Sequence, residues 1–129
     1  MLNNVNILRH IRTIRESILM NVFENIPYND EKMGHRKVVD EKHLLIMQIA
    51  LKQGQEVPQH HANSNVHLLV LQGVLTVNLA GTDFQIKAGD LLPVKFQTLM
   101  KIKNTGNESA TFLVIKTPNP TEMLKNAIL

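Results

Sequence analysis

The chain has 129 residues, no cysteine and a formal net charge of +3 at pH 7 with histidine counted as neutral. This length fits one domain with one core, and the absence of cysteine excludes disulfides, thiolate catalysis and cysteine-ligated metal centres. Aromatic residues are only 4% of the chain. Because the basic residues are also scattered rather than gathered in one stretch, we expect no nucleic-acid partner.

An amphipathic helix is predicted over residues 3–25, within an N-terminal helical extension of residues 1–26. Its apolar side chains recur at three- and four-residue steps, at Leu8, Ile11, Ile14, Ile18, Val22 and Phe23. We expect this helix to pack on the domain or on a second subunit, and an anionic membrane surface or another partner is the alternative. Met20 is an alternative first residue.

The sequence predicts no membrane partner and a cytoplasmic location. No apolar run reaches the roughly 18 residues of a spanning helix. Arginines interrupt the N-terminal segment, which is unlike the apolar centre of a signal peptide.

A loop is predicted over residues 26–34, and short β-strands follow it. The runs of β-type residues are 43–51, 66–72, 74–80, 83–87, 99–103 and 110–116. Turns rich in Gly, Asn and Asp separate them, and no helix intervenes, so the chain is predicted to be all-β, a barrel or sandwich.

A short C-terminal helix is predicted over residues 119–129. Asn119 suits the N-cap and Pro120 suits the first helical position. Glu122 stands at the third position, where it can complete a capping box.

Three of the six histidines lie in the segment GQEVPQHHANSNVHLLVLQG, residues 54–73. Imidazole is the commonest protein ligand for transition metals, so this cluster ahead of an apolar strand indicates either a metal site or its remnant.

The spacing of turns around this cluster resembles the cupins. Gly54, His60 and Gly73 stand at matching positions of the first family motif, and residues 89–104, from Gly-Asp to Asn, match the second motif in length. The resemblance covers residues 40–118. It implies a double-stranded β-helix, a barrel of the jelly-roll type, over residues 38–118 of a single domain spanning 1–129.

The resemblance also implies where a metal would bind. Metal-binding cupins use two histidines and a glutamate from the first motif and a histidine from the second, and these positions hold His60, Ala62, Val66 and Met100. One ligand of four is retained. Because Lys101 and Lys103 would occupy the outer face of their strand, we expect Met100 to point into the barrel. These four residues are the candidates for lining a pocket.

A metal site remains open through the other histidines. In an unbroken strand His61 and His67 share the face opposite to His60, but a bulge near residues 62–65 would turn His67 inward. His61, Asn63 and His67 can also be read as a shifted motif. The metal alternative is therefore a divalent transition ion at His60, His61, His67 and Met100. His10, His35 and His43 are interpreted as ordinary surface or loop residues.

The altered ligand positions suggest two functions from different classes, and a third function is a further alternative. Loss of ligands leaves an apolar interior, which favours a non-catalytic cupin-like domain that binds a small organic ligand. The alternative is a metal-dependent enzyme of the oxygenase or isomerase type with an atypical histidine-rich site, and the third is a packed domain that acts through its surfaces. A homodimer is expected, because two terminal helices with apolar faces need a cover.

Overall fold

Residues 19–128 are described by the structure, a computed structural model. Within them the elements are β1 (Gly34–Glu41), β2 (Leu44–Leu51), β3 (Glu56–His61), β4 (Asn65–Gln72), β5 (Val74–Leu79), β6 (Thr82–Lys87), β7 (Leu91–Val94), β8 (Leu99–Asn104), β9 (Ala110–Thr117) and α2 (Pro120–Ile128).

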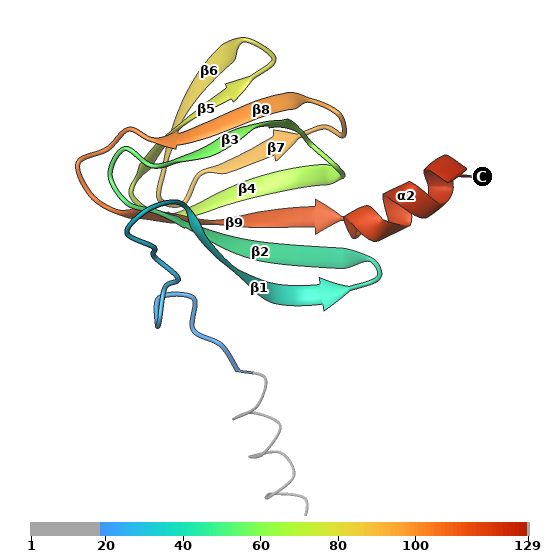
Figure 1. Cartoon of the computed structure of the whole chain (residues 1–129), viewed down its shortest axis with the longest axis horizontal. Helices are drawn as coiled ribbons and strands as arrows, with labels where there is room; N and C mark the ends of the chain where they lie inside the picture. Colours follow the sequence, from blue (N-terminus) through green and yellow to red (C-terminus); the bar gives the residue numbers. More distant parts are fainter. Residues whose placement is uncertain (1–18, 129) are drawn as a thin grey trace, which may run out of the picture.

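The strands form two antiparallel sheets. One has the order β1-β2-β9-β4-β7 and the other the order β3-β8-β5-β6. Figure 1 shows the four-stranded sheet lying over the five-stranded one, with α2 continuing beyond the end of β9. This arrangement confirms the all-β double-stranded β-helix with a short C-terminal helix.

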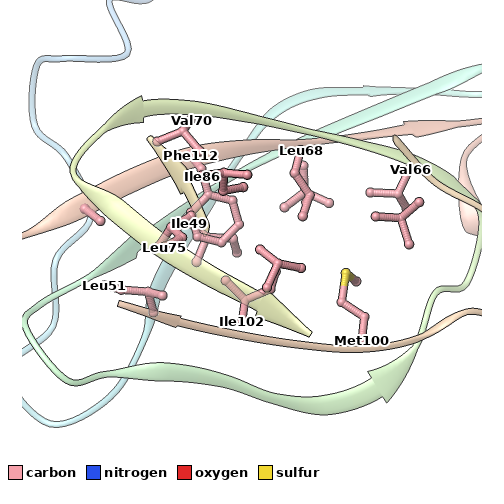
Figure 2. Packing of buried hydrophobic residues seen from close by; sticks show 14 of the residues in the cluster. Ile49, Leu51, Val66, Leu68, Val70, Leu75, Ile86, Met100, Ile102 and Phe112 are labelled. Carbon is pink, nitrogen blue, oxygen red and sulfur yellow. The ribbon is translucent and has the colours of Figure 1, made fainter. Parts of the chain in front are cut away.

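Alternation along β8 directs every second side chain into the barrel. In β8, Met100, Ile102 and Asn104 are buried while Lys101 and Lys103 are exposed. Successive side chains of a strand point to opposite faces. Because the two lysines point into solvent, the residues next to them point into the barrel. The predicted inward direction of Met100 is confirmed, and Figure 2 shows its side chain facing the interior from β8.

One end of the barrel is filled by side chains, and we call it the closed end. Its aliphatic residues Leu51, Leu75 and Val70 are all buried (Figure 2). Asn104 is buried there too, and its Nδ2 donates to the carbonyls of Leu51 at 2.9 Å and Glu108 at 2.8 Å. Its Oδ1 accepts from the Gly106 N–H at 3.0 Å, so both amide protons and the amide oxygen have partners.

The glycine shared with the first cupin motif has a packing reason. Gly73 has φ 88°, and a Cβ built there would lie 2.6 Å from the Cβ of Ala110. Such a contact is closer than two carbon atoms can approach. Only glycine therefore allows the β4–β5 turn to lie against the start of β9.

Three strands, β1, β3 and β7, were absent from the sequence prediction. The barrel starts with β1 at Gly34 rather than at residue 38, and β3 and β7 were not predicted. Both β3 and β7 lie at the edge of their sheet and contain a proline, Pro58 and Pro93. Proline is tolerated at sheet edges. The residues of β3 are mostly exposed and β7 is a run of four apolar residues, so neither sequence alternates between apolar and polar residues.

The helix predicted over residues 3–25 is not formed by residues 19–25. These residues form turns and irregular chain, with Oδ1 of Asn21 accepting from the Phe23 N–H at 2.9 Å. Ile26 precedes Pro27, and the residue before a proline disfavours helix. The prediction was wrong for this part, and its remainder, residues 1–18, lies outside the described residues.

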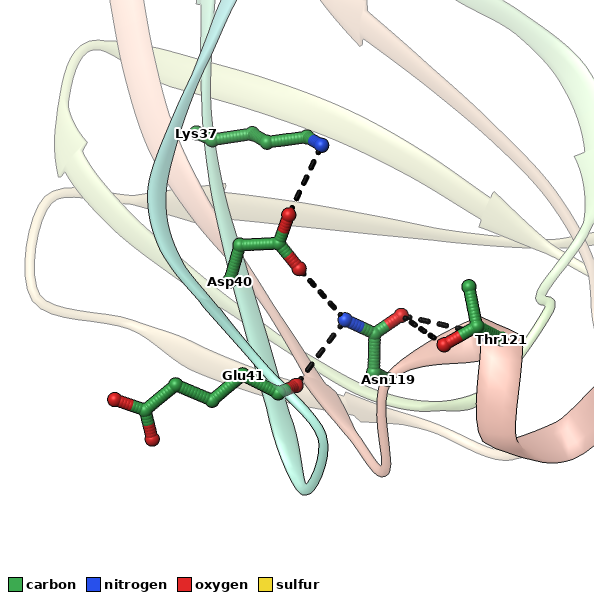
Figure 3. Close-up of polar contacts among 5 residues, drawn as sticks. All are labelled: Lys37, Asp40, Glu41, Asn119 and Thr121. Atoms are coloured by element: carbon green, nitrogen blue, oxygen red, sulfur yellow. Dashed lines mark hydrogen bonds and ion pairs between the residues drawn. The ribbon is translucent and has the colours of Figure 1, made fainter.

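The start of α2 is fixed by Asn119 (Figure 3). Its Oδ1 accepts from the Thr121 N–H at 3.2 Å, and its Nδ2 donates to Asp40 Oδ1 at 2.9 Å and to the Glu41 carbonyl at 3.1 Å. The predicted N-cap is confirmed. The capping box is not formed, because the Asn119 N–H donates to the Lys42 carbonyl at 3.3 Å. Within residues 19–128, no helix has the length and apolar character to cross a membrane.

Candidate functional site

A cavity of about 290 Å³ lies inside the barrel at the end where β9 leads to α2. We call this the open end. The cavity wall is mainly apolar, and its large side chains include Met33, Met47, Val66, Met100, Phe112 and Val114. Four polar side chains complete it, those of His35, His60, Asn63 and Lys116.

Lys116 reaches the cavity from the central strand of the five-stranded sheet. In β9 it follows Phe112 and Val114 at steps of two residues, and all three line the cavity. Its Nζ donates to Asn63 Oδ1 at 2.9 Å. The side chain is half-buried, and this burial lowers the pKa of Lys116 because a protein interior solvates the ammonium less well than water does.

His60 faces the cavity because β3 contains a bulge. Val57 pairs with Ile102 and His60 pairs with Met100, so β3 has one more residue than β8 between these two pairs. The extra residue places His60 on the same face as Met100. The Nδ1 atom lies 2.9 Å from the carbonyl oxygen of Pro58. Since a carbonyl oxygen only accepts, Nδ1 carries a proton and donates this hydrogen bond.

All four pocket candidates line the cavity. His60, Ala62, Val66 and Met100 come from β3, the segment after it, β4 and β8. Ala62, Val66 and Met100 are buried, whereas His60 is exposed at the cavity mouth. Figure 2 shows Val66 and Met100 pointing toward each other across the interior.

The metal alternative is not assembled by the fold. His61 pairs with Leu99 and His67 with Pro93, and both histidines are exposed and outside the cavity wall. The bulge expected near residues 62–65 does not turn His67 inward, because the bulge lies before His60 instead. Among residues 19–128, no three His, Cys, Asp or Glu side chains are grouped to hold an ion.

The shifted motif fails for the same reason. Asn63 lines the cavity, but His61 and His67 do not. The family's four ligand positions therefore provide one imidazole, one thioether and two side chains without a donor atom. This set does not fit a transition ion, which needs at least three donors from the protein.

Two polar cavity residues were missed from the sequence. His35 was interpreted as an ordinary surface or loop residue, yet it lies in β1 opposite Ile49 and lines the cavity. No local signal identifies it, because β1 was not among the predicted strands. Lys116 did leave a signal, since strict alternation in residues 110–116 places it on the face of Phe112 and Val114.

Comparison with known proteins agrees with the fold and with the motif spacing. A family model described as a cupin domain matches residues 46–116, more than half of the chain. The chain is 33% identical over 88 residues to the uncharacterized protein MJ0764 of Methanocaldococcus jannaschii, covering 67% of this chain and 76% of that protein.

Solved structures give the same result. An RmlC-like cupin family protein with a double-stranded β-helix fold from M. jannaschii superposes with a TM-score of 0.68 at 29% identity, covering 75% of this chain and 92% of that one. TT1209 of Thermus thermophilus superposes with a TM-score of 0.72 at 20% identity, covering 78% and 97%, and this likeness concerns the fold alone. The chain therefore belongs to the cupin family.

Proposed function

We propose that this chain is a non-catalytic cupin domain that binds a small organic molecule in the cavity at the open end. The observation that carries the proposal is the chemistry of the wall at the family's ligand positions. Ala62 and Val66 have no donor atom and Met100 offers only a soft thioether, so apolar contact replaces metal coordination there. A mainly apolar wall with a few polar groups is typical of small-molecule sites.

The size of the cavity limits the ligand. Its volume of about 290 Å³ is close to the lower limit of roughly 300 Å³ for ligand pockets. It corresponds to the liquid volume of roughly ten water molecules. A compact molecule with an apolar body of this size would gain affinity from each buried carbon, at about 25 cal/mol per Å² of apolar surface.

Blocking the cavity tests the proposal directly. Ala62 is buried in the wall, so Ala62→Leu places three more carbon atoms in the space that a ligand would fill. The probe is 1-octanol, a neutral molecule of suitable size, and the measurement is the thermal unfolding midpoint with and without it. We expect 1-octanol to raise the midpoint of the wild type and not that of Ala62→Leu, because only the open cavity stabilises the folded state through binding.

A matched substitution controls for the added leucine. Ala88 is exposed in the turn between β6 and β7, so Ala88→Leu adds the same atoms away from the cavity and should respond like the wild type. An unchanged wild-type midpoint at the solubility limit of 1-octanol contradicts the proposal.

Elemental analysis separates the proposal from the metal-dependent enzyme. His35 and His60 both line the cavity. The specific alternative is therefore an ion that these two imidazoles bind together with ligands that the chain does not supply. Protein purified without chelators should hold well under one equivalent of nickel, iron, manganese, copper or zinc. One full equivalent that is lost in His60→Ala would replace the binding function with the enzyme of the oxygenase or isomerase type.

The homodimer stays a prediction. Leu124 of α2 is 66% exposed, which is consistent with an apolar face that a second subunit covers. Light scattering at micromolar concentration measures the mass, and a monomer would contradict the prediction.

A further inference from the structure

The polar side chains that line the cavity include a positively charged residue and no negatively charged one. They are His35, His60, Asn63 and Lys116, and no aspartate or glutamate lines the wall. A ligand in this cavity therefore meets one full positive charge, two imidazoles and an amide. No carboxylate lines the wall to balance a cationic ligand.

Lys116 has no carboxylate partner among residues 19–128. The ion pairs described by the structure are Lys37–Asp40, Lys52–Asp30, Lys101–Glu56 and Lys125–Glu122. The lysine that is half-buried beside an apolar wall is thus paired only with the Asn63 amide oxygen. An ammonium taken out of water without a counter-charge is unfavourable, and a bound anion would remove that penalty.

Asn63 offers a second contact to an anion. Its Oδ1 accepts from Lys116 at 2.9 Å, which orients the amide so that its Nδ2 group keeps both protons for another acceptor. Nδ2 donates no hydrogen bond to the described part of the chain. His60 is different, because its Nδ1 already donates to the carbonyl oxygen of Pro58 at 2.9 Å.

We propose that the ligand is an organic carboxylate whose apolar body lies on the methionine-rich wall and whose carboxylate binds Lys116 Nζ and Asn63 Nδ2. This inference rests on the proposed function and specifies its ligand class. Two carboxylate oxygens match two donors on neighbouring side chains, and charge-assisted hydrogen bonds of this kind are roughly twice as strong as neutral ones. Met33, Met47 and Met100 are flexible side chains that can adapt to the shape of the body.

The test compares octanoate with 1-octanol, which share the apolar chain and differ in the head group. Calorimetric titration at pH 7 gives both dissociation constants for the wild type, for Lys116→Met and for Lys87→Met. Lys87 is exposed on β6 and remote from the cavity wall, so it controls for loss of one positive charge. We expect Lys116→Met to weaken octanoate by about tenfold or more, which is the fold-change of one charge-assisted hydrogen bond.

The other results locate any failure. In Lys116→Met, 1-octanol should lose much less affinity than octanoate does, which shows that the cavity still binds, and Lys116→Arg should keep most of the octanoate affinity because it keeps the charge. If Lys87→Met weakens octanoate binding as much as Lys116→Met does, or if Lys116→Met does not weaken it, the proposal of a carboxylate ligand is wrong. Binding of 1-octanol in either case still supports the proposed function. Binding of neither probe to the wild type overturns both.

Discussion

The closed end and the open end of the barrel are built from the same strands and the same alternation, yet their inner positions hold different side chains. At the closed end, Leu51, Val70 and Leu75 are almost completely buried in the hydrophobic core. At the open end the inner positions hold methionine, alanine, histidine and lysine around a cavity of about 290 Å³. The difference indicates that one end stabilises the fold and the other is free to bind, so substitutions at the two ends should have separable effects.

The largest expected effect is at the closed end. Leu75 is fully buried on β5, and Leu75→Ala leaves a void that its packed neighbours cannot fill. We expect the free energy of unfolding to fall by about 3–4 kcal/mol, measured by urea denaturation with circular dichroism. Leu91→Ala is the matched control, because Leu91 is 56% exposed, and it should change stability by about 0.5 kcal/mol or less. Equal losses would contradict the description of the closed end.

The next effect comes from the buried amide of the same end. Asn104→Ala removes two donated hydrogen bonds and one accepted hydrogen bond, those with Leu51, Glu108 and Gly106. We expect a loss of about 2–3 kcal/mol in the free energy of unfolding, since backbone groups are left without partners. Asn107→Ala, an exposed change in the same turn, should have little effect. If the two variants are equally stable, Asn104 does not hold this turn.

A smaller loss is expected at the open end from a side chain of similar size. Met100 is 3% exposed but borders the cavity, so part of its surface faces empty space rather than packed atoms. Met100→Ala should reduce the free energy of unfolding by about 2 kcal/mol, the lower limit for this type of change. The same urea measurement applies. A loss as large as that of Leu75→Ala would mean that the open end is packed as tightly as the closed end.

Lys116 should give the open end a pH dependence of stability that the closed end lacks. Burial lowers its pKa in the folded chain, whereas a lysine in the unfolded chain titrates near 10.4. Between these two pKa values the unfolded chain binds more protons, so the free energy of unfolding rises with pH across that interval. This gain is lost again as pH falls through the folded pKa.

Urea unfolding from pH 7 to pH 10 measures this effect. The variant Lys116→Met should lack the rise, and Lys87→Met should keep it. A wild type and a Lys116→Met variant with parallel pH profiles would contradict the half-buried position of the lysine.

The smallest expected effect concerns the anchor of α2 beside the open end. The hydrogen bond from Lys37, with a second from Asn119, lowers the pKa of Asp40 (Figure 3). The ionised carboxylate thus contributes stability at pH values above its unfolded pKa of about 3.9, and this contribution is lost as pH falls through the lower folded pKa. Asp40→Asn should weaken the acid dependence while leaving an acceptor for Asn119. Identical acid unfolding curves for the two proteins would exclude this anchor as an acid-sensitive contact.

Local sequence pattern was sufficient for the strands that bury one face. Alternation in β8 placed Met100 inside and two lysines outside, and the turn residues placed the cupin motifs. It was insufficient for β3, whose residues are mostly exposed on an edge strand. An edge strand has no buried row of apolar residues, so periodicity cannot reveal it.

The candidate site was only partly predictable for a related reason. His60 and Met100 followed from the motif spacing, and Lys116 could have followed from its alternation with Phe112. His35 depends on the pairing of β1 with β2. The inward position of His60, and not His61, depends on a bulge that is visible only against β8. Such register information is not local in the sequence.

The doublet of adjacent histidines gives the bulged edge strand a form of redundancy. Slippage of β3 by one residue against β8 would abolish the bulge and exchange the two faces of the strand beyond Val57. Gln59 would then lie opposite Met100, and His61 would face inward in place of His60. An imidazole would therefore still face the interior after this rearrangement. With a single histidine at this point of β3, the same rearrangement would turn the imidazole outward.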